Sequence, residues 1–187
     1  MRPTENRRLL SPRFFARYVA AASWLLAGCA ITHPVASLKQ SMGAPPALGI
    51  QGMVDAKANQ DQVVDLDVVV IGDSSSLKLI EKMDASTWFG PKGRCTFLGQ
   101  KGVKVEFHSW QFAPGQTFYV HLVTGADAKE VLAFANYATP GPHRIVLAKS
   151  GGQVLDLGLD GLHTVDRKIS SASDQPAPEM QSVCSDN

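Results

Sequence analysis

Val63–Asp73, which reads VVDLDVVVIGD, indicates the class of fold expected for this 187-residue chain. Its first half alternates apolar and acidic residues, which places valine and leucine side chains on one face of a strand and carboxylates on the other. Its second half is a run of β-branched residues that ends in Gly-Asp, a polar turn. The stretch predicts a strand with a buried face, followed at once by a turn.

The sequence downstream of this strand predicts a mainly β domain with one short helical insertion. Ser75–Phe89 spaces its large apolar side chains as a helix does. Val103–His108 alternates like the first strand, and its apolar phase reverses after His108, which predicts a bulge or bend. Phe118–Leu122 follows a Pro-Gly turn and keeps its apolar residues on one face. Strands about ten residues apart with little helix are typical of a small sandwich.

Two later segments are read from their turn and capping residues. Asp127–Glu130 spells a capping box before Val131–Tyr137, which can form either a helix or a strand. Ile145–Ala148 and Val154–Leu159 flank Ser-Gly-Gly-Gln, the pattern of a β-hairpin. The predicted sandwich spans residues 61–168, enough for one small domain.

The first 28 residues have the pattern of a bacterial lipoprotein signal peptide. Five arginines precede the apolar run Tyr18–Gly28, which is too short to cross a bilayer as a helix, since that takes ~20 residues. Leu26–Cys29 matches the lipobox, so we expect Cys29 to be lipidated and to become the first residue of the mature chain. Ala30, in place of an aspartate, favours the periplasmic face of the outer membrane of a Gram-negative bacterium.

Low-complexity segments flank the predicted domain. Residues 29–60 are rich in Ala, Gly, Pro and Ser and predict a flexible tether, and residues 169–187 predict a disordered polar tail. Loss of residues 1–28 removes five arginines and one glutamate, so the formal net charge changes from +1 to about −3. No basic patch is left to attract a phosphate backbone, which argues against nucleic-acid binding.

The cysteines indicate a possible cross-link and no metal site. With Cys29 assigned to lipidation, Cys95 and Cys184 remain, in a compartment that permits disulfides. Their pairing would close a loop of about 90 residues and stabilise the fold by ~4–5 kcal/mol in the chain-entropy model. The sequence leaves this pairing open. Isolated cysteines and five scattered histidines do not have zinc-ligand spacing, and we expect no metal and no cofactor.

A serine-esterase pattern is present but poorly supported. Gly72-Asp73-Ser74 follows a strand, and Asp160 and His163 have the Asp-x-x-His spacing of GDSL esterases. In that reading Ser74 is the nucleophile, His163 the base and Asp160 the residue that orients it. However, the later hairpin does not suit the parallel strand–helix units of that family, and its Gly-x-Asn-Asp block is missing. We expect no enzyme, and we expect Asp73 or Ser74 to cap the following helix.

One predicted partner-binding surface lies at the end of the helical insertion. Trp88 and Phe89 would anchor a protein partner if they were exposed, and would fill the core if they were buried. Lys92 and Arg94 add basic side chains in the loop that follows. The sequence leaves both readings of Trp88 open.

Histidines and aromatic residues form a second candidate site. His108 and His121 are expected to face each other on adjacent strands, next to Trp110 and Tyr119. Such a cluster either binds a ligand or packs across the strands as ordinary sheet residues do.

The order of these features resembles the TssJ-like family of type VI secretion outer-membrane lipoproteins. The shared pattern is the lipobox, the tether, the alternating strand, the helical insertion, the turn FAPGQTF, the strand AFANY and a final hairpin. The resemblance implies a transthyretin-like β-sandwich that acts without catalysis and docks the periplasmic part of an inner-membrane secretion protein. The alternative is an envelope lipoprotein that binds a small ligand or envelope polymer near Trp88 and Trp110.

Overall fold

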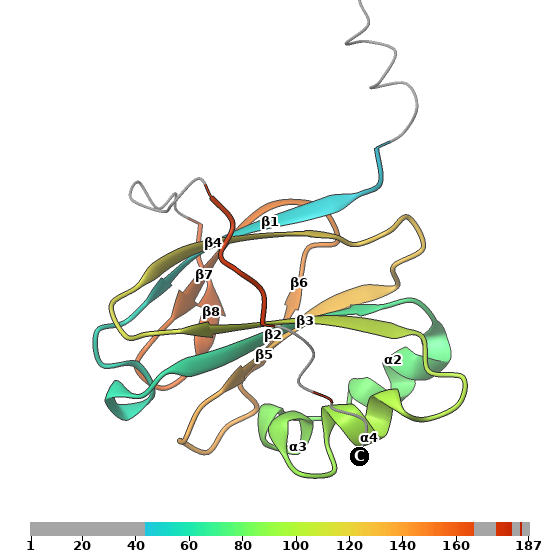
Figure 1. The fold of residues 1–187 in the computed structure, drawn as a ribbon, viewed down its shortest axis with the longest axis horizontal. Coiled ribbons are helices and arrows are strands. Elements are labelled where there is room, and N and C mark those ends of the chain that lie inside the picture. The colour runs from blue at the N-terminus through green and yellow to red at the C-terminus, as the bar shows by residue number, and fades with distance from the viewer. Residues whose placement is uncertain (1–43, 167–174, 181–183, 185–187) are drawn as a thin grey trace, which may run out of the picture.

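The computed structural model describes residues 44–166, 175–180 and 184, and these form a sandwich of two four-stranded sheets (Figure 1). The predicted mainly β class is therefore confirmed. The predicted signal peptide, residues 1–28, and the predicted lipidation site, Cys29, lie outside the described residues.

Each sheet combines strands from distant parts of the sequence. The first sheet has the order β4 (Thr117–Val123), β1 (Ala47–Val54), β7 (Gly151–Leu157) and β8 (Leu162–Thr164). The second sheet has the order β3 (Val105–Phe112), β2 (Val64–Ile71), β5 (Glu130–Asn136) and β6 (Arg144–Leu147). Strands β1 and β7 pair in parallel, and all other neighbours in these sheets are antiparallel.

Strand β2 is buried on both faces, which explains its change from alternation to a continuous apolar run. Leu66 and Val68 belong to the core between the two sheets, whereas Val69 and Ile71 belong to a second core beneath the helices. The acidic residues of β2 share the helix-facing side, so Asp67 is fully buried, although alternation alone suggests exposure to solvent.

Three short helices cover the outer face of the second sheet (Figure 1). They are α2 (Ser74–Ile80), α3 (Ala85–Phe89) and α4 (Arg94–Leu98). The predicted helical insertion holds for α2 and α3, and α4 extends it. A short 3₁₀ turn, η1 (Ala58–Asp61), joins β1 to β2.

Asp73 caps α2, as one of the two sequence alternatives expected. Its carboxylate accepts hydrogen bonds from the backbone amides of Ser75 at 2.8 Å and Ser76 at 2.9 Å, and from both serine hydroxyls. The Ser75 hydroxyl, followed by the donors of Ser76, holds the pKa of Asp73 well below its usual value. Asp84 caps α3 in the same way, because it accepts a hydrogen bond from the Thr87 amide at 2.7 Å.

Three local predictions about strands are settled by the sheets. The ambiguous segment 131–137 is mostly strand, as β5. Strand β3 pairs with β2 in one unbroken register, so the predicted bulge after His108 is wrong. The apolar phase reverses there because one face of β3 meets the sandwich core and the other meets the helices. The predicted hairpin is also wrong, since β6 and β7 lie in different sheets.

The predicted flexible tether, residues 29–60, is wrong in its second half, which contains strand β1. Strand β1 lies between β4 and β7, and its Leu48 and Ile50 are fully buried. Glycines gave this segment the composition of a linker, but Gly52 has a packing reason. A Cβ atom there would lie 1.9 Å from Cζ of Phe118, so only glycine lets the two strands approach.

The predicted disordered tail is corrected for the residues that the structure describes. Residues 175–180 run beside strands β4 and β3, as the dark-red segment of Figure 1 shows. Cys184 is bonded to Cys95 of α4. This segment belongs to the folded domain.

Candidate functional site

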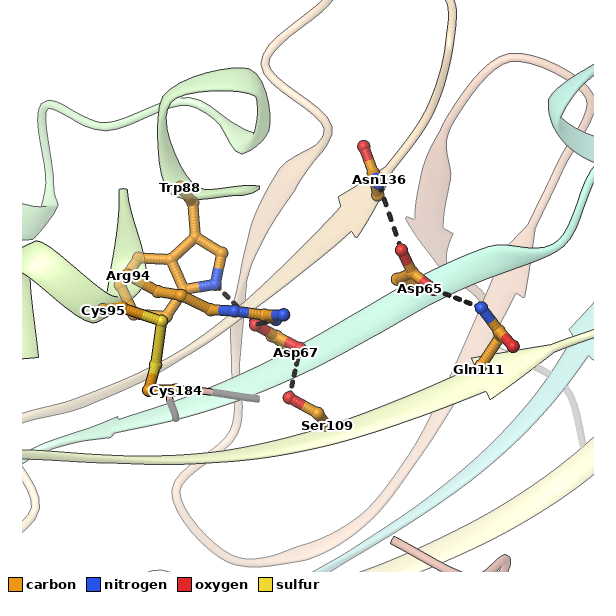
Figure 2. A network of polar contacts seen from close by, with 9 residues as sticks. All are labelled: Asp65, Asp67, Trp88, Arg94, Cys95, Ser109, Gln111, Asn136 and Cys184. Carbon is orange, nitrogen blue, oxygen red and sulfur yellow. Dashed lines mark hydrogen bonds and ion pairs between the residues drawn. A yellow bond between two sulfur atoms is a disulfide. The ribbon is translucent and has the colours of Figure 1, made fainter. Parts of the chain in front are cut away.

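Asp67 on β2 carries a buried carboxylate that joins the helices to the second sheet (Figure 2). Its Oδ2 accepts a hydrogen bond from the indole Nε1 of Trp88 at 2.7 Å and pairs with the guanidinium of Arg94. Its Oδ1 accepts a hydrogen bond from the hydroxyl of Ser109 at 2.6 Å. The Asp67 side chain is fully buried and that of Arg94 is 13% exposed. A buried carboxylate needs such partners, because an unpaired charge in the interior is strongly destabilising.

Trp88 is a core residue and is not available as an anchor for a partner. Its side chain is fully buried, and its ring stacks on Phe134 with 5.0 Å between the centroids. Phe97 and Phe107 meet it edge-on at 6.2 and 6.1 Å. The sequence left open whether Trp88 is an exposed anchor or a core residue, and the structure shows that it is a core residue.

Arg94 also stabilises the packing between the helices and the second sheet. Besides its ion pair with Asp67, its guanidinium lies over the rings of Phe89 at 5.2 Å and Phe107 at 5.7 Å. Phe89 is half-buried beneath it. Of the four residues predicted to bind a partner, Lys92 alone is exposed.

A shallow groove beside Lys92 is the remaining candidate for docking. It has a volume of about 430 Å³ and is lined by Ser86, Thr87, Gly90, Pro91 and Lys92. The turn that follows it is closely packed, because a Cβ at Gly93 would lie 2.0 Å from the carbonyl oxygen of Trp88. Lys92 is the one cationic side chain in the lining of this groove.

A disulfide between Cys95 and Cys184 fixes the end of the chain to α4. The two Cα atoms are 5.4 Å apart and the residues are 89 positions apart in the sequence. The structure thus contains the bridge that the sequence left open. Cys95 directly follows Arg94, so the cross-link and the buried ion pair share one helix (Figure 2).

The three residues of the esterase pattern are not brought together. Ser74 begins α2, beyond the end of β2 in the second sheet. His163 is an exposed residue of β8 in the first sheet, and Asp160 lies in the turn before it. Ser74 therefore lies with the second sheet, whereas His163 and the turn that holds Asp160 belong to the first. The arrangement needed for a Ser-His-Asp triad is not formed.

The predicted cluster of His108 and His121 is not formed either. His108 lies on β3 and His121 on β4, and these strands belong to different sheets. Trp110 faces the core between the sheets, whereas Trp88 lies in the core beneath the helices. The prediction of a ligand pocket near Trp88 and Trp110 is therefore wrong, because the second sheet separates the two side chains.

A different depression lies on the outer face of the first sheet. Its volume is about 520 Å³, and Gly49 and Gly152 form part of its floor. Tyr119 and His121 line one side. Its floor is low because paired glycines on β1 and β7 carry no side chains.

The described part of the chain contains neither a metal-ligand grouping nor a membrane-spanning helix. There, no group of three or more His, Cys, Asp or Glu side chains is placed to hold a metal ion. None of the helices described is long and apolar enough to cross a membrane.

The described residues define a two-sheet β-sandwich with a helical layer held by a buried ion pair and a disulfide. Solved structures of type VI secretion proteins are similar to it. TssJ1, a type VI secretion (T6SS) lipoprotein from Pseudomonas aeruginosa, has a TM-score of 0.50 and 15% identity, over 67% of this chain and 99% of that one. A chain of a type VI membrane complex has a TM-score of 0.50 and 14% identity, over 65% of this chain and 99% of that one.

Lip of Serratia marcescens, a membrane-bound component of the Type VI Secretion System, has a TM-score of 0.49 and 16% identity, over 67% of this chain and 100% of that one. No protein-family model and no curated protein matches the chain. The similarity noted in the sequence therefore holds at the level of the fold.

Proposed function

We propose that this protein is a lipoprotein of the outer membrane, on its periplasmic face, and a structural subunit of a type VI-like secretion apparatus. In this role it acts without catalysis and docks the periplasmic part of an inner-membrane secretion protein. The observation that carries the proposal is the fold shared with TssJ1 over 99% of that chain. The lipobox at Cys29 supports it independently, because it is a sequence motif outside the residues that the structure describes.

The lipid anchor would confine the domain to a narrow zone beside one membrane. The sequence predicts a flexible tether, of which residues 30–43 lie outside the described residues. A flexible chain of that length would have a mean end-to-end distance of roughly 20 Å. The domain can thus meet a partner that reaches towards the outer membrane, but it cannot cross the periplasm to find one.

The groove beside Lys92 is the docking surface that we favour. It combines a mostly apolar lining with one exposed ammonium group, so it suits a partner that offers an apolar side chain and a nearby carboxylate. Arg94 is not part of this surface, since it is committed to Asp67. A charge reversal at Arg94 would damage the fold and would not test docking.

Crosslinking and co-purification of the intact lipoprotein from envelopes tests the proposal. We expect an inner-membrane secretion protein in the eluate. Lys92→Glu should lower its yield by up to about fivefold, since exposed ion pairs contribute ~0.2–1 kcal/mol. Lys82→Glu is the matched control, because Lys82 is also exposed in the helical layer but does not line the groove.

Failure of the proposed docking surface and failure of the proposed function would give different results. Equal capture by Lys92→Glu and Lys82→Glu would remove the groove from the interface. Secretion that is unaffected by deletion of the gene would remove the function itself.

The depression at Gly49 and Gly152 supports a second candidate, an envelope lipoprotein that binds a small ligand or envelope polymer on its outer sheet face. A small molecule or polymer in the eluate, without secretion proteins, would favour that role. Gly152→Trp, whose side chain meets open space and fills the depression, should then abolish the recovery of that ligand.

A further inference from the structure

The segment Gln175–Met180 bridges the edges of the two sheets. The amide of Ala177 donates a hydrogen bond to the carbonyl of Tyr119 on β4 at 2.6 Å. Three residues later, the amide of Met180 donates to the carbonyl of Ser109 on β3 at 2.8 Å. Strands β4 and β3 are the outermost strands of their sheets, so one short segment occupies both open edges (Figure 1).

Ala177 packs against the core between the sheets, and a nearly buried indole binds its carbonyl. The indole Nε1 of Trp110 donates to the carbonyl of Ala177 at 3.3 Å. Pro176 and Pro178 flank this residue, and they have no amide hydrogen that would need a partner. Aromatic grooves that donate to a backbone carbonyl are a common way to bind extended Pro-x-x-P-type segments.

Glu179 makes a further contact between this segment and β3. The carboxylate of Glu179 forms a hydrogen bond with Nδ1 of His108 at 3.0 Å. The His108 ring stacks with Trp110, with 6.1 Å between their centroids. The edges therefore contact the Pro-Ala-Pro-Glu sequence through an indole, an imidazole and the carbonyl of Tyr119, and a second strand carbonyl, that of Ser109, binds the Met180 that follows.

The described polar contacts of this segment lie close to solvent. Pro176, Pro178 and Glu179 are exposed, and each hydrogen bond near solvent contributes little. The disulfide of Cys184 with Cys95 supplies the second attachment, four residues beyond Met180. Such a cross-link keeps the local concentration of the segment high without adding any contact in the groove.

We propose that the edges of β3 and β4 form a groove that binds an extended Pro-x-Pro-Glu segment, and that residues 176–179 fill this groove in the oxidised protein. A dithiol reductant opens it. The reductant transfers two electrons and two protons to the Cys95–Cys184 bond, which yields two thiols and leaves the reductant as a disulfide. The freed groove then accepts an equivalent segment of a partner protein. This proposal does not depend on the secretion role.

Hydrogen exchange of the full chain tests the control by the disulfide. In the chain reduced with dithiothreitol, the amides of Ala177 and Met180 should exchange about tenfold faster or more than in the oxidised chain, because opening becomes local. The amides of β2 should keep their protection and serve as the internal control. Equal exchange rates at Ala177 and Met180 in the two states would overturn the control by the disulfide.

A synthetic peptide with the sequence of residues 175–180 tests the site. Ala177→Pro removes the amide that donates to Tyr119, so this variant should leave the groove open, whereas Ala177→Ser keeps the donor. We expect the peptide to bind the reduced Ala177→Pro chain at least about tenfold more tightly than the oxidised native chain. The Ala177→Ser chain should behave like the native one.

The reduced native chain is the second sample, so the result does not depend on one variant. A peptide with proline in place of its alanine is the negative control, since it lacks the same donor. Peptide binding to either opened chain but not to the oxidised chain supports the site. The absence of binding to both opened chains overturns it.

Discussion

Arg94→Met should lower the free energy of unfolding by about 3 kcal/mol, because it leaves the buried carboxylate of Asp67 without its cation. Removal of one partner from a buried ion pair costs ~3–5 kcal/mol. We expect the lower end, since the donors of Trp88 and Ser109 still reach this carboxylate and the Arg94 side chain is 13% exposed. For a domain of this size, the loss corresponds to a fall in melting temperature of roughly 10 °C.

Urea and thermal unfolding of the oxidised protein measure this effect. Lys92→Met is the matched control, because it removes an exposed cation two residues away and should change stability by less than ~0.5 kcal/mol. The double variant Asp67→Leu/Arg94→Met should recover much of the loss, as apolar replacements of buried pairs often do. A loss below about 1 kcal/mol for Arg94→Met would refute the argument that this pair joins the helices to the sheet.

Four further predictions concern a cap, a close approach, the lipid anchor and the serine. Hydrogen bonds hold the pKa of Asp73 below its ordinary 3.8, so its stabilisation is present above about pH 4 and is lost as the pH falls through the folded-state pKa. Asp73→Ala should therefore melt earlier than the native protein at pH 7 and converge with it in strong acid; a constant difference would contradict this. Gly52→Ala should cost about 1–3 kcal/mol in urea unfolding, because its Cβ would clash with Phe118, and an unchanged midpoint would exclude that clash. Cys29→Ser should leave an uncleaved or mislocalised precursor, and normal fractionation with the outer membrane would disprove lipidation. The purified protein should not hydrolyse simple esters, and hydrolysis that is lost in Ser74→Ala would show that the esterase reading was correct.

The parts of the fold that could be predicted are those specified by neighbouring residues. The alternation in Val63–Asp73 and the cap at Asp73 are local signals, and both lie where expected. Strand β1 was missed because Gly49 and Gly52 resemble linker residues until their neighbours are known. The glycine at position 52 is explained by Phe118, which lies on a different strand far along the chain.

The candidate site was harder to predict because burial depends on distant partners. The sequence around Trp88 does not show whether its side chain is exposed or buried. Its burial depends on contacts with Asp67 and Phe134, which are distant in the sequence. The hairpin prediction failed for a similar reason, since a turn pattern does not show in which sheet the next strand pairs. The segment 175–180 has few large apolar residues, and its contacts are mostly backbone and polar groups that composition does not reveal.

The central place of β1 has a mechanical consequence for an anchored subunit. In the proposed role, tension between the outer membrane and a docked partner enters the domain through the first residues of β1. This strand pairs with β4 on one side and with β7 on the other, seven residue pairs on each. A pull along β1 would shear both ladders at once, and bonds loaded together yield less readily than bonds peeled open one by one. In the proposed role, the two ladders of β1 would share the load at the point where the anchor attaches.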